Sequence, residues 1–289
     1  MSNIFIVGAP RSGTNALRDL LCSFPSFITW PCDELNYAWK FSNRSYEFDD
    51  LEISDISLSL INYLHRLFNL RRDRFPGCRF LVEKTCANCL RVPFVNHIFP
   101  NSIYIYIRRN PYDAIYSSTK RWKSDLNLLY LLKKALYVPK QDLIFYATQF
   151  IKYRTKQFFS LDNKLPTWGP RFQGIDYIRQ TSSLAELCLY QWYECCKNAE
   201  ESLFSLSADG LTVIVIDYND FAVNTEKVLC NIFEKLDYVA DSCFISRYSS
   251  QIHSYSIDKG VAMFDPLSLQ RISSFLNSKP PLPYFNGTY

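Results

Sequence analysis

The chain has 289 residues, a hydrophobic fraction of 48% and a net charge of +4 at pH 7. This length fits one large domain or two small ones, and the mild positive charge is too weak to predict nucleic-acid binding. No N-terminal signal is visible, and no apolar run reaches the roughly 20 residues that span a bilayer. We therefore expect a soluble, cytoplasmic protein with no transmembrane segment.

The ten cysteines do not form the framework of a small secreted domain, so we expect reduced thiols, mostly buried. Cys86 and Cys89 make a C-x-x-C pair. No second cysteine or histidine pair accompanies it at zinc-site spacing, and we expect no metal site.

Residues 3–15 read N-I-F-I-V-G-A-P-R-S-G-T-N and predict a strand, a tight loop and the start of a helix. Ile4–Val7 is a short apolar run, and Gly8 and Gly13 bracket the loop that follows it. In such a loop, backbone N–H groups and the positive end of the helix converge on one anion. The alternative interpretation is an ordinary strand-to-helix turn with chance glycines.

The loop differs from that of the nucleotide triphosphatases, whose pattern is G-x-x-x-x-G-K-[ST]. Thr14 stands where the lysine of that pattern belongs, and the cation lies inside the loop at Arg11. A fixed guanidinium without that lysine suits a phosphosulfate or a monophosphate that is held without a metal.

Four β-like runs separated by helical stretches predict an α/β fold with a central parallel sheet between two layers of helices. The expected strands are Ile4–Val7, Arg79–Val82, Ile103–Ile107 and Thr212–Ile216. The expected helices are Asn15–Phe24, Ser57–Arg72, Ala87–Ile98, Tyr112–Lys123, Gln141–Phe159, Ser183–Ser205 and Thr225–Leu236. We treat residues 1–289 as one domain in which residues 123–180 are a helical and loop insertion, expected to form a lid or a substrate wall.

A second motif lies in residues 102–122, S-I-Y-I-Y-I-R-R-N-P-Y-D-A-I-Y-S-S-T-K-R-W. Arg109 follows the strand, and Pro111 begins a helix at a position where its missing N–H costs nothing. Ser117 comes eight residues after Arg109, and Arg121 comes twelve after it. A guanidinium at the strand end and a hydroxyl two turns into the helix can bind one phosphate from two sides.

These two motifs resemble those of the sulfotransferase family. Pro10–Thr14, P-R-S-G-T, is similar to the family's 5′-phosphosulfate loop, and Arg109–Ser117, R-N-P-Y-D-A-I-Y-S, is similar to its 3′-phosphate motif. Val82–Thr85, Asn96–Asn101 and Val215–Phe221 resemble further segments of the family. The resemblance covers most of the chain outside the insertion.

The likeness is closer to bacterial, Golgi-type and tyrosylprotein sulfotransferases than to the cytosolic phenol and steroid enzymes, which carry lysine where Arg11 stands. It implies a P-loop-like α/β/α fold and 3′-phosphoadenosine 5′-phosphosulfate (PAPS) as co-substrate, with no metal. It also implies in-line transfer of the sulfuryl group to an acceptor hydroxyl or amine.

The resemblance also implies site residues. Those implied to hold the donor are Pro10, Arg11, Ser12, Gly13, Thr14, Asn15, Arg109, Ser117, Arg121 and Tyr218. Lys84 matches a family lysine that contacts the departing bridging oxygen, and Arg11 is given a catalytic role beside it. The catalytic base that the resemblance implies is Glu34, with Asp33 as its rival, because the register of the likeness in Trp30–Leu35, W-P-C-D-E-L, is open.

Two other functions stay open at this point. One is a metal-dependent phosphotransferase or nucleotidase, for which Asp217 is the only obvious metal-binding carboxylate. The other is a non-catalytic nucleotide- or partner-binding protein on a sulfotransferase scaffold. A small molecule, a glycan or a peptide could serve as acceptor. The segment around Arg171 either contacts a substrate or is a rigid packed loop, and the sequence determines no oligomeric state.

Overall fold

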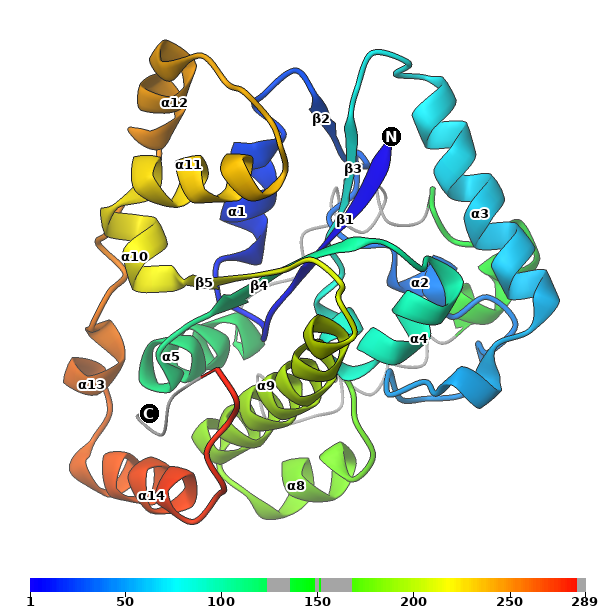
Figure 1. Ribbon diagram of the computed structural model, residues 1–289. Helices are drawn as coiled ribbons and strands as arrows, with labels where there is room; N and C mark the ends of the chain where they lie inside the picture. Colours follow the sequence, from blue (N-terminus) through cyan, green and yellow to red (C-terminus); the bar gives the residue numbers. More distant parts are fainter. Residues whose placement is uncertain (124–135, 149–150, 152–167, 285–289) are drawn as a thin grey trace.

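The structure is a computed structural model that describes residues 1–123, 136–148, 151 and 168–284. Its centre is a parallel sheet with the strand order β2-β3-β1-β4-β5 (Figure 1). The strands are β1 Ser2–Val7, β2 Phe27–Ile28, β3 Phe80–Glu83, β4 Ile103–Arg108 and β5 Val213–Asp217. The predicted α/β fold with a central parallel sheet is confirmed, and all four expected strands are present. β2, which has two residues, was not predicted.

Alternate side chains of β1 enter two separate apolar cores. Phe5 and Val7 belong to one core, while Ile4 and Ile6 belong to the other. The first core lies under α3 (Leu58–Asp73), α4 (Val92–Ile98), α5 (Pro111–Trp122) and α9 (Leu184–Ala208). The second lies under α1 (Thr14–Leu21) and α11 (Thr225–Lys235). Because both faces of a parallel sheet are buried, its central strands are almost continuously apolar.

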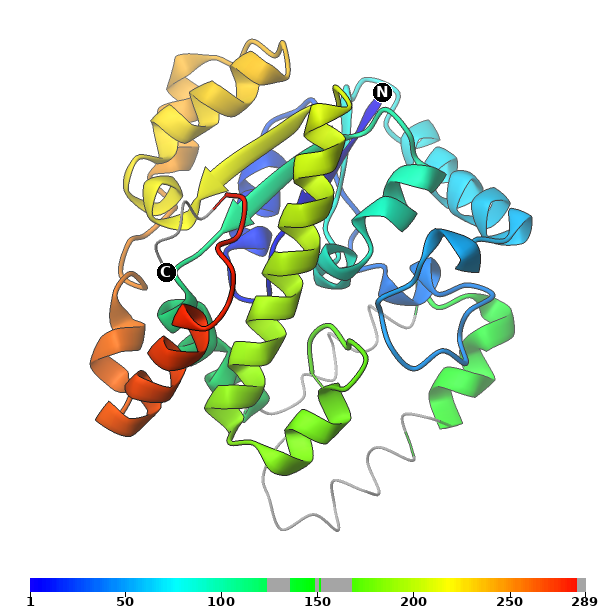
Figure 2. The same ribbon diagram turned by 60° about the horizontal axis from the view of Figure 1, so that its bottom comes forward.

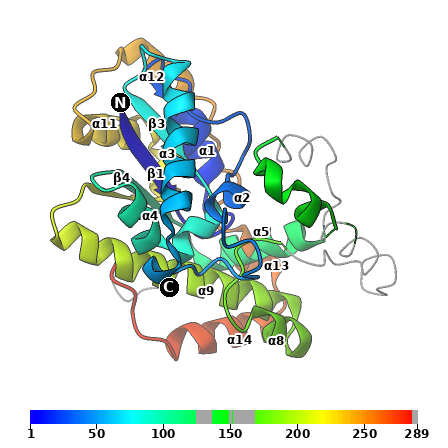
Figure 3. The same ribbon diagram turned by 90° about the vertical axis from the view of Figure 1, so that its right-hand side faces the viewer.

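The longest helix, α9, lies over one face of the sheet (Figure 2). Two further helices, α8 (Ile175–Thr181) and α14 (Pro266–Asn277), pack against it (Figure 3). The remaining elements are α2 Asn36–Trp39, η1 Ile53–Asp55, η2 Cys86–Leu90, η3 Lys140–Asp142, α10 Tyr218–Val223, α12 Ser242–Ser249 and α13 Lys259–Met263. No helix of the described residues is long and apolar enough to cross a membrane.

One expected helix is wrong. Ala87–Ile98 is not continuous, because the 3₁₀ helix η2 ends at Leu90 and α4 begins at Val92. Arg91 breaks the helix with φ −144° and ψ 37°, and Pro93 occupies the first turn of α4. Proline has no N–H and its ring clashes with the carbonyl four residues before it, so it begins a helix and does not continue one.

Part of the expected insertion lies outside the described residues. Within the expected helix Gln141–Phe159, residues 143–148 are helical, whereas residues 152–159 are among those not described. Residues 124–135, 149–150 and 152–167 of the insertion are likewise outside the description. The function of the insertion as a lid or a substrate wall stays a prediction.

The carboxyl ends of four strands meet at one edge of the sheet. β1 lies between β3 and β4, and β5 pairs with the far side of β4. The loop with Arg11 follows β1, while Lys84, Arg109 and Tyr218 follow β3, β4 and β5. Strands β2 and β3 lie on one side of β1, and β4 and β5 lie on the other, so the strand order reverses at β1 and this edge is a topological switch point. Open α/β sheets bind ligands at such points.

Candidate active site

Backbone geometry explains the two glycines of the first loop. Gly13 has a φ of +93°, and a Cβ added there would lie 2.5 Å from the ring of Tyr218. A Cβ on Gly8 would lie 2.6 Å from the carbonyl oxygen of Ile107. Arg11 itself has a φ of +68°, in a region that side chains other than glycine rarely adopt. Such strain gathers at functional sites, where the surrounding structure holds it in place.

Replacement of Gly13 by alanine is expected to lower the free energy of unfolding by about 1–3 kcal/mol, because it adds a steric clash to an unfavourable φ. Urea denaturation measures this change. Gly77→Ala is the matched control, since no atom lies within 4 Å of a Cβ at that position. The control is expected to stay within about 0.5 kcal/mol of the wild type. Equal effects of the two substitutions would contradict the role of the Gly13 backbone.

The two basic motifs meet, although they are about a hundred residues apart in sequence. Arg11 Nε donates to Ser117 Oγ at 2.9 Å. Arg109 Nη1 donates to the backbone oxygen of Arg11 at 2.7 Å. The loop after β1, the end of β4 and the second turn of α5 therefore form one site.

The site is electropositive and leaves polar groups unsatisfied. Burial lowers the pKa of Arg11, and the nearby charge of Arg121 lowers it further. Burial also lowers the pKa of Arg109. Neither Arg11 nor Arg109 forms an ion pair with the part of the chain that the structure describes. Ser12 Oγ and Arg109 Nε are buried without a hydrogen-bond partner among these same residues. Arginines without an ion pair and buried N–H and O–H donors without a partner favour the binding of an anion.

Tyr218 and Ser256 complete the surroundings of Arg109. The guanidinium lies 4.3 Å from the centre of the Tyr218 ring, and its Nη2 donates to the backbone oxygen of Ser256 at 2.7 Å. The hydroxyls of Tyr218 and Ser256 are 2.7 Å apart. Sequence reasoning named Tyr218 but missed Ser256.

One sequence signal points to the segment around Ser256. Gly260 is the single glycine between residues 211 and 285. A Cβ there would lie 2.2 Å from the carbonyl carbon of Tyr112, so α13 can approach α5 only with glycine at this position. The buried carboxylate of Asp113 accepts from the backbone N–H groups of Asp258 and Gly260, at 2.9 and 2.7 Å. This contact fixes the Ser256 segment beside Arg109.

Lys84 and Glu34 form an ion pair next to the loop. Lys84 Nζ donates to Glu34 Oε1 at 3.0 Å, and the backbone N–H of Cys86 donates to the same oxygen at 3.3 Å. Lys84 Nζ lies 3.9 Å from Cys86 Sγ, which lies 3.8 Å from Thr14 Oγ1.

Lys84 is a permanent cation at neutral pH. Burial lowers its pKa, but neighbouring negative groups, Glu34 among them, outweigh burial and raise the pKa overall. Burial raises the pKa of the Cys86 thiol to about 12. Cys86 is therefore uncharged at neutral pH, so Glu34 supplies the balancing charge.

Asp33 has different partners from Glu34. Its carboxylate accepts from Arg18 Nη1 at 3.0 Å and from Asn15 Nδ2 at 3.3 Å. Both donors belong to α1, so this carboxylate ties the 30–35 segment to that helix. In the structure Glu34 therefore pairs with Lys84, whereas Asp33 pairs with Arg18.

Asp217 and Arg171 are both engaged by neighbouring residues. Asp217 Oδ2 lies 3.4 Å from Arg108 Nε, and Asp217 also caps the N-terminus of α10. Arg171 pairs with Asp176 at 2.7 Å, and its backbone N–H donates to Asp49 at 2.9 Å. These contacts make the Arg171 segment a packed loop, and a contact of this segment with substrate stays a prediction.

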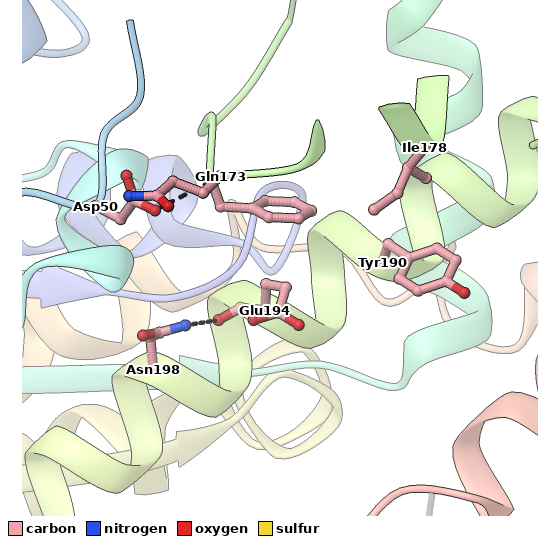
Figure 4. Close-up of a pocket in the computed structure, with 7 residues that line it drawn as sticks. Asp50, Gln173, Ile178, Tyr190, Glu194 and Asn198 are labelled. Carbon is pink, nitrogen blue, oxygen red and sulfur yellow. Dashed lines mark hydrogen bonds between the residues drawn. The ribbon is translucent and has the colours of Figure 1, made fainter. Parts of the chain in front are cut away.

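A separate hollow of about 370 Å³ opens beside α9 (Figure 4). Its lining residues are Asp50, Phe172, Gln173, Ile178, Tyr190, Glu194 and Asn198. Two of these carry carboxylates and none is a lysine or an arginine, so the hollow would repel a nucleotide with several phosphates. The electropositive cluster at the strand ends is therefore the candidate anion site.

Comparisons with known proteins identify the family of this chain. The model of the "Sulfotransferase family" matches residues 3–162, more than half of the chain. Nodulation protein NoeE of Sinorhizobium fredii (strain NBRC 101917 / NGR234) is 25% identical over 130 residues. That match covers 41% of this chain and 31% of NoeE, so the chain spans less than a third of that relative.

Solved structures share the fold at low sequence identity. The sulfotransferase domain of the curacin biosynthetic pathway is 16% identical, with a TM-score of 0.54 over 96% of this chain and 98% of that one. The sulfotransferase domain of the Synechococcus PCC 7002 olefin synthase is 15% identical, with a TM-score of 0.52 over 96% and 95%. A sulfotransferase of Alicyclobacillus acidocaldarius is 14% identical, with a TM-score of 0.51 over 96% and 92%. By its match to the family model, the chain belongs to the sulfotransferase family.

Proposed function

We propose that this protein transfers the sulfuryl group of PAPS to an acceptor hydroxyl or amine. The observation that carries the proposal is the contact between the two basic motifs, Arg11 Nε with Ser117 Oγ and Arg109 with the Arg11 carbonyl. A nucleotide with phosphate groups at both its 5′ and 3′ positions needs cations from two directions. These motifs supply them at the edge of the sheet where α/β folds bind ligands.

The residues fit this donor. Residues 10–15, with the Arg11 side chain, would hold the 5′-phosphosulfate at the start of α1, where backbone N–H groups favour an anion. Arg109, Ser117 and Arg121 would hold the 3′-phosphate. The buried hydroxyl of Ser12 and the Nε of Arg109, which have no partner in the described chain, would gain one from the ligand.

The Lys84–Glu34 pair supplies the two charges that sulfuryl transfer requires. Glu34 would accept the proton of the acceptor hydroxyl as the new S–O bond forms. The bond from sulfur to the bridging oxygen breaks in the same displacement, and its electron pair stays on the bisphosphate product. Lys84, kept protonated by Glu34, would stabilise the charge on that oxygen. Arg11 would stabilise the sulfuryl oxygens.

The direct test is transfer of ³⁵S from labelled PAPS to fractionated cell extract, with mass spectrometry of each product. We expect a labelled product, and we expect the rate to survive EDTA. Loss of the rate in EDTA would favour the metal-dependent phosphotransferase. Binding of adenosine 3′,5′-bisphosphate without transfer to any acceptor would favour the other alternative, a non-catalytic binding protein on a sulfotransferase scaffold. Either result overturns the proposal.

The Arg109→Ala substitution is expected to weaken binding of adenosine 3′,5′-bisphosphate about 10- to 100-fold, because hydrogen bonds to charged groups are worth about 1.5–3 kcal/mol. Isothermal titration calorimetry measures the affinity. Arg66→Ala removes an exposed arginine of α3 and is the control for lost charge. Since Arg109 also holds the Arg11 loop, Ser117→Ala is the milder second variant, with a smaller loss expected. Unchanged affinity in both site variants would reject the 3′-phosphate assignment.

A further inference from the structure

A buried polar network lies directly behind the Lys84–Glu34 pair. Its centre is Glu83, the last residue of β3, which is 1% exposed. The Glu83 carboxylate accepts from the Thr85 hydroxyl, from Asn88 Nδ2 at 2.9 Å and from Trp39 Nε1 at 3.4 Å. A carboxylate without a full ion pair is costly to bury, so three donors on one group indicate a specific role.

The network holds the backbone immediately after Glu34. The Thr85 hydroxyl accepts from the backbone N–H of Leu35 at 2.9 Å. Asn88 Oδ1 accepts from Arg91 Nε at 2.9 Å, and Arg91 Nη2 donates to Asn36 Oδ1 at 2.6 Å. Two consecutive residues after Glu34 are thus anchored to the segment that follows β3.

Two non-covalent bonds therefore join residues 34–35 to residues 84–85. Glu34 pairs with Lys84, and Leu35 bonds to Thr85. The first link is a side-chain ion pair at the surface of the site, where the Glu34 side chain is 20% exposed. The second is fully buried, since Thr85 is 0% exposed. The buried Leu35–Thr85 bond, next to the partly exposed ion pair, fixes the direction from which the Glu34 carboxylate approaches Lys84.

We propose that Thr85 is a positioning residue, whose hydroxyl, oriented by the Glu83 carboxylate, holds Glu34 against Lys84. This inference rests on the proposed function, because it concerns the base of that reaction. Because Thr85 is fully buried, we expect it to contact neither substrate nor donor. It acts through the Leu35 N–H on the placement of Glu34.

The charge of Glu83 supports this arrangement. Burial raises the pKa of Glu83 to about 7, while the bonds from Thr85 and Trp39 and the charges of Arg91 and Lys84 oppose that rise. All three hydrogen-bonding neighbours donate to the carboxylate. A proton on Glu83 would place a further donor among three donors, so the network is best satisfied when Glu83 is ionised.

The test compares Thr85→Val, which keeps the shape and loses the hydroxyl, with Thr85→Ser, which keeps the hydroxyl. We expect Thr85→Val to lower kcat about tenfold or more, because a misplaced base loses part of its 10²–10⁴-fold contribution. Thr85→Ser is expected to restore most of the rate. In a Glu34→Gln background the Thr85→Val substitution should have no further effect on kcat, since the two residues act as one unit. An equal loss in both backgrounds would make Thr85 merely structural and overturn the proposal.

A second readout does not depend on sulfuryl transfer. Only the uncharged amine of a lysine reacts in reductive methylation, and the charge of Glu34 opposes the lowering of the Lys84 pKa by burial. Lys84 should therefore methylate faster in Thr85→Val and in Glu34→Gln, and at the wild-type rate in Thr85→Ser, as followed by peptide mass spectrometry. Thr181→Val is the control for an exposed threonine. If Thr85→Val does not fold, Thr85→Ala takes its place.

The rate of sulfuryl transfer and the rate of Lys84 methylation together distinguish failure of the proposed function from failure of the positioning role. A wild-type protein that transfers no sulfuryl group, but whose Lys84 methylates faster in Thr85→Val, would refute the proposed function and keep the positioning role. Wild-type Lys84 reactivity in a folded Thr85→Val variant would overturn the positioning role itself.

Discussion

Replacing Glu34 with glutamine is expected to lower kcat about 10²- to 10⁴-fold, the usual contribution of a general base. Glutamine keeps the size of the side chain and can still accept from Lys84, but it cannot take a proton from the acceptor. Affinity for adenosine 3′,5′-bisphosphate should change little, because Glu34 faces Lys84 and not the Arg109 cluster. Single-turnover transfer from labelled PAPS measures the rate.

Asp33→Asn is the matched control for Glu34→Gln. Its carboxylate is held by Arg18 and Asn15, at 3.0 and 3.3 Å, so its loss removes contacts to α1 and no proposed base. We expect less than a tenfold change in kcat, the size of a minor positioning effect of about 1.4 kcal/mol. If Asp33→Asn were the more damaging variant, the two carboxylates would exchange roles and Glu34 would not be the base.

The Lys84→Ala substitution is expected to lower kcat about 10²- to 10³-fold with little change in bisphosphate affinity. The reason is that charge develops on the bridging oxygen mainly in the transition state, where a fixed cation is most effective. The loss should appear in single-turnover rates and not in calorimetric titration of the product nucleotide.

Two further variants sharpen the Lys84 prediction. Lys84→Met keeps most of the buried stem, which separates loss of charge from loss of packing, and it should be as slow as Lys84→Ala. Lys227→Ala removes an exposed lysine of α11 and should be neutral. If Lys84→Met lost nucleotide affinity while keeping its turnover, Lys84 would be a binding residue and not a catalytic one.

Several elements with strong local signals were predicted correctly. Ile4–Val7 and Ile103–Ile107 lie within β1 and β4, because runs of apolar and β-branched residues suit a strand that is buried on both faces. Pro111 begins α5 as expected, since its fixed φ and missing N–H match the first turn of a helix.

Two of the features that were missed depend on contacts distant in sequence, whereas the missed helix α14 carries local signals, Asp265 at its N-cap and Pro266 in its first turn. β2 has two residues and pairs only with β3, so no periodic pattern reveals it. The break at Arg91 serves the buried network, because this fully buried side chain reaches both Asn88 and Asn36. Its distant partner, Asn36, was not named from the sequence.

For the site, the sequence by itself determined the parts that are local. The loop with Arg11 and the strand-to-helix motif with Arg109 and Ser117 each follow from a short segment, because backbone geometry and residue type act there at short range. These motifs also predicted the family, which the family comparison confirmed.

Only the tertiary structure decided which residues of distant segments contact one another in the site. It brought Arg11 to Ser117, placed Glu34 and not Asp33 against Lys84, and set the Ser256 segment beside Arg109. The physical reason is that parallel strands align their carboxyl ends. Residues that follow β1, β3, β4 and β5 therefore share one edge, whatever their separation along the chain. Spacing in the sequence carries no information about such contacts, because the register of the strands and the packing of the helices set them.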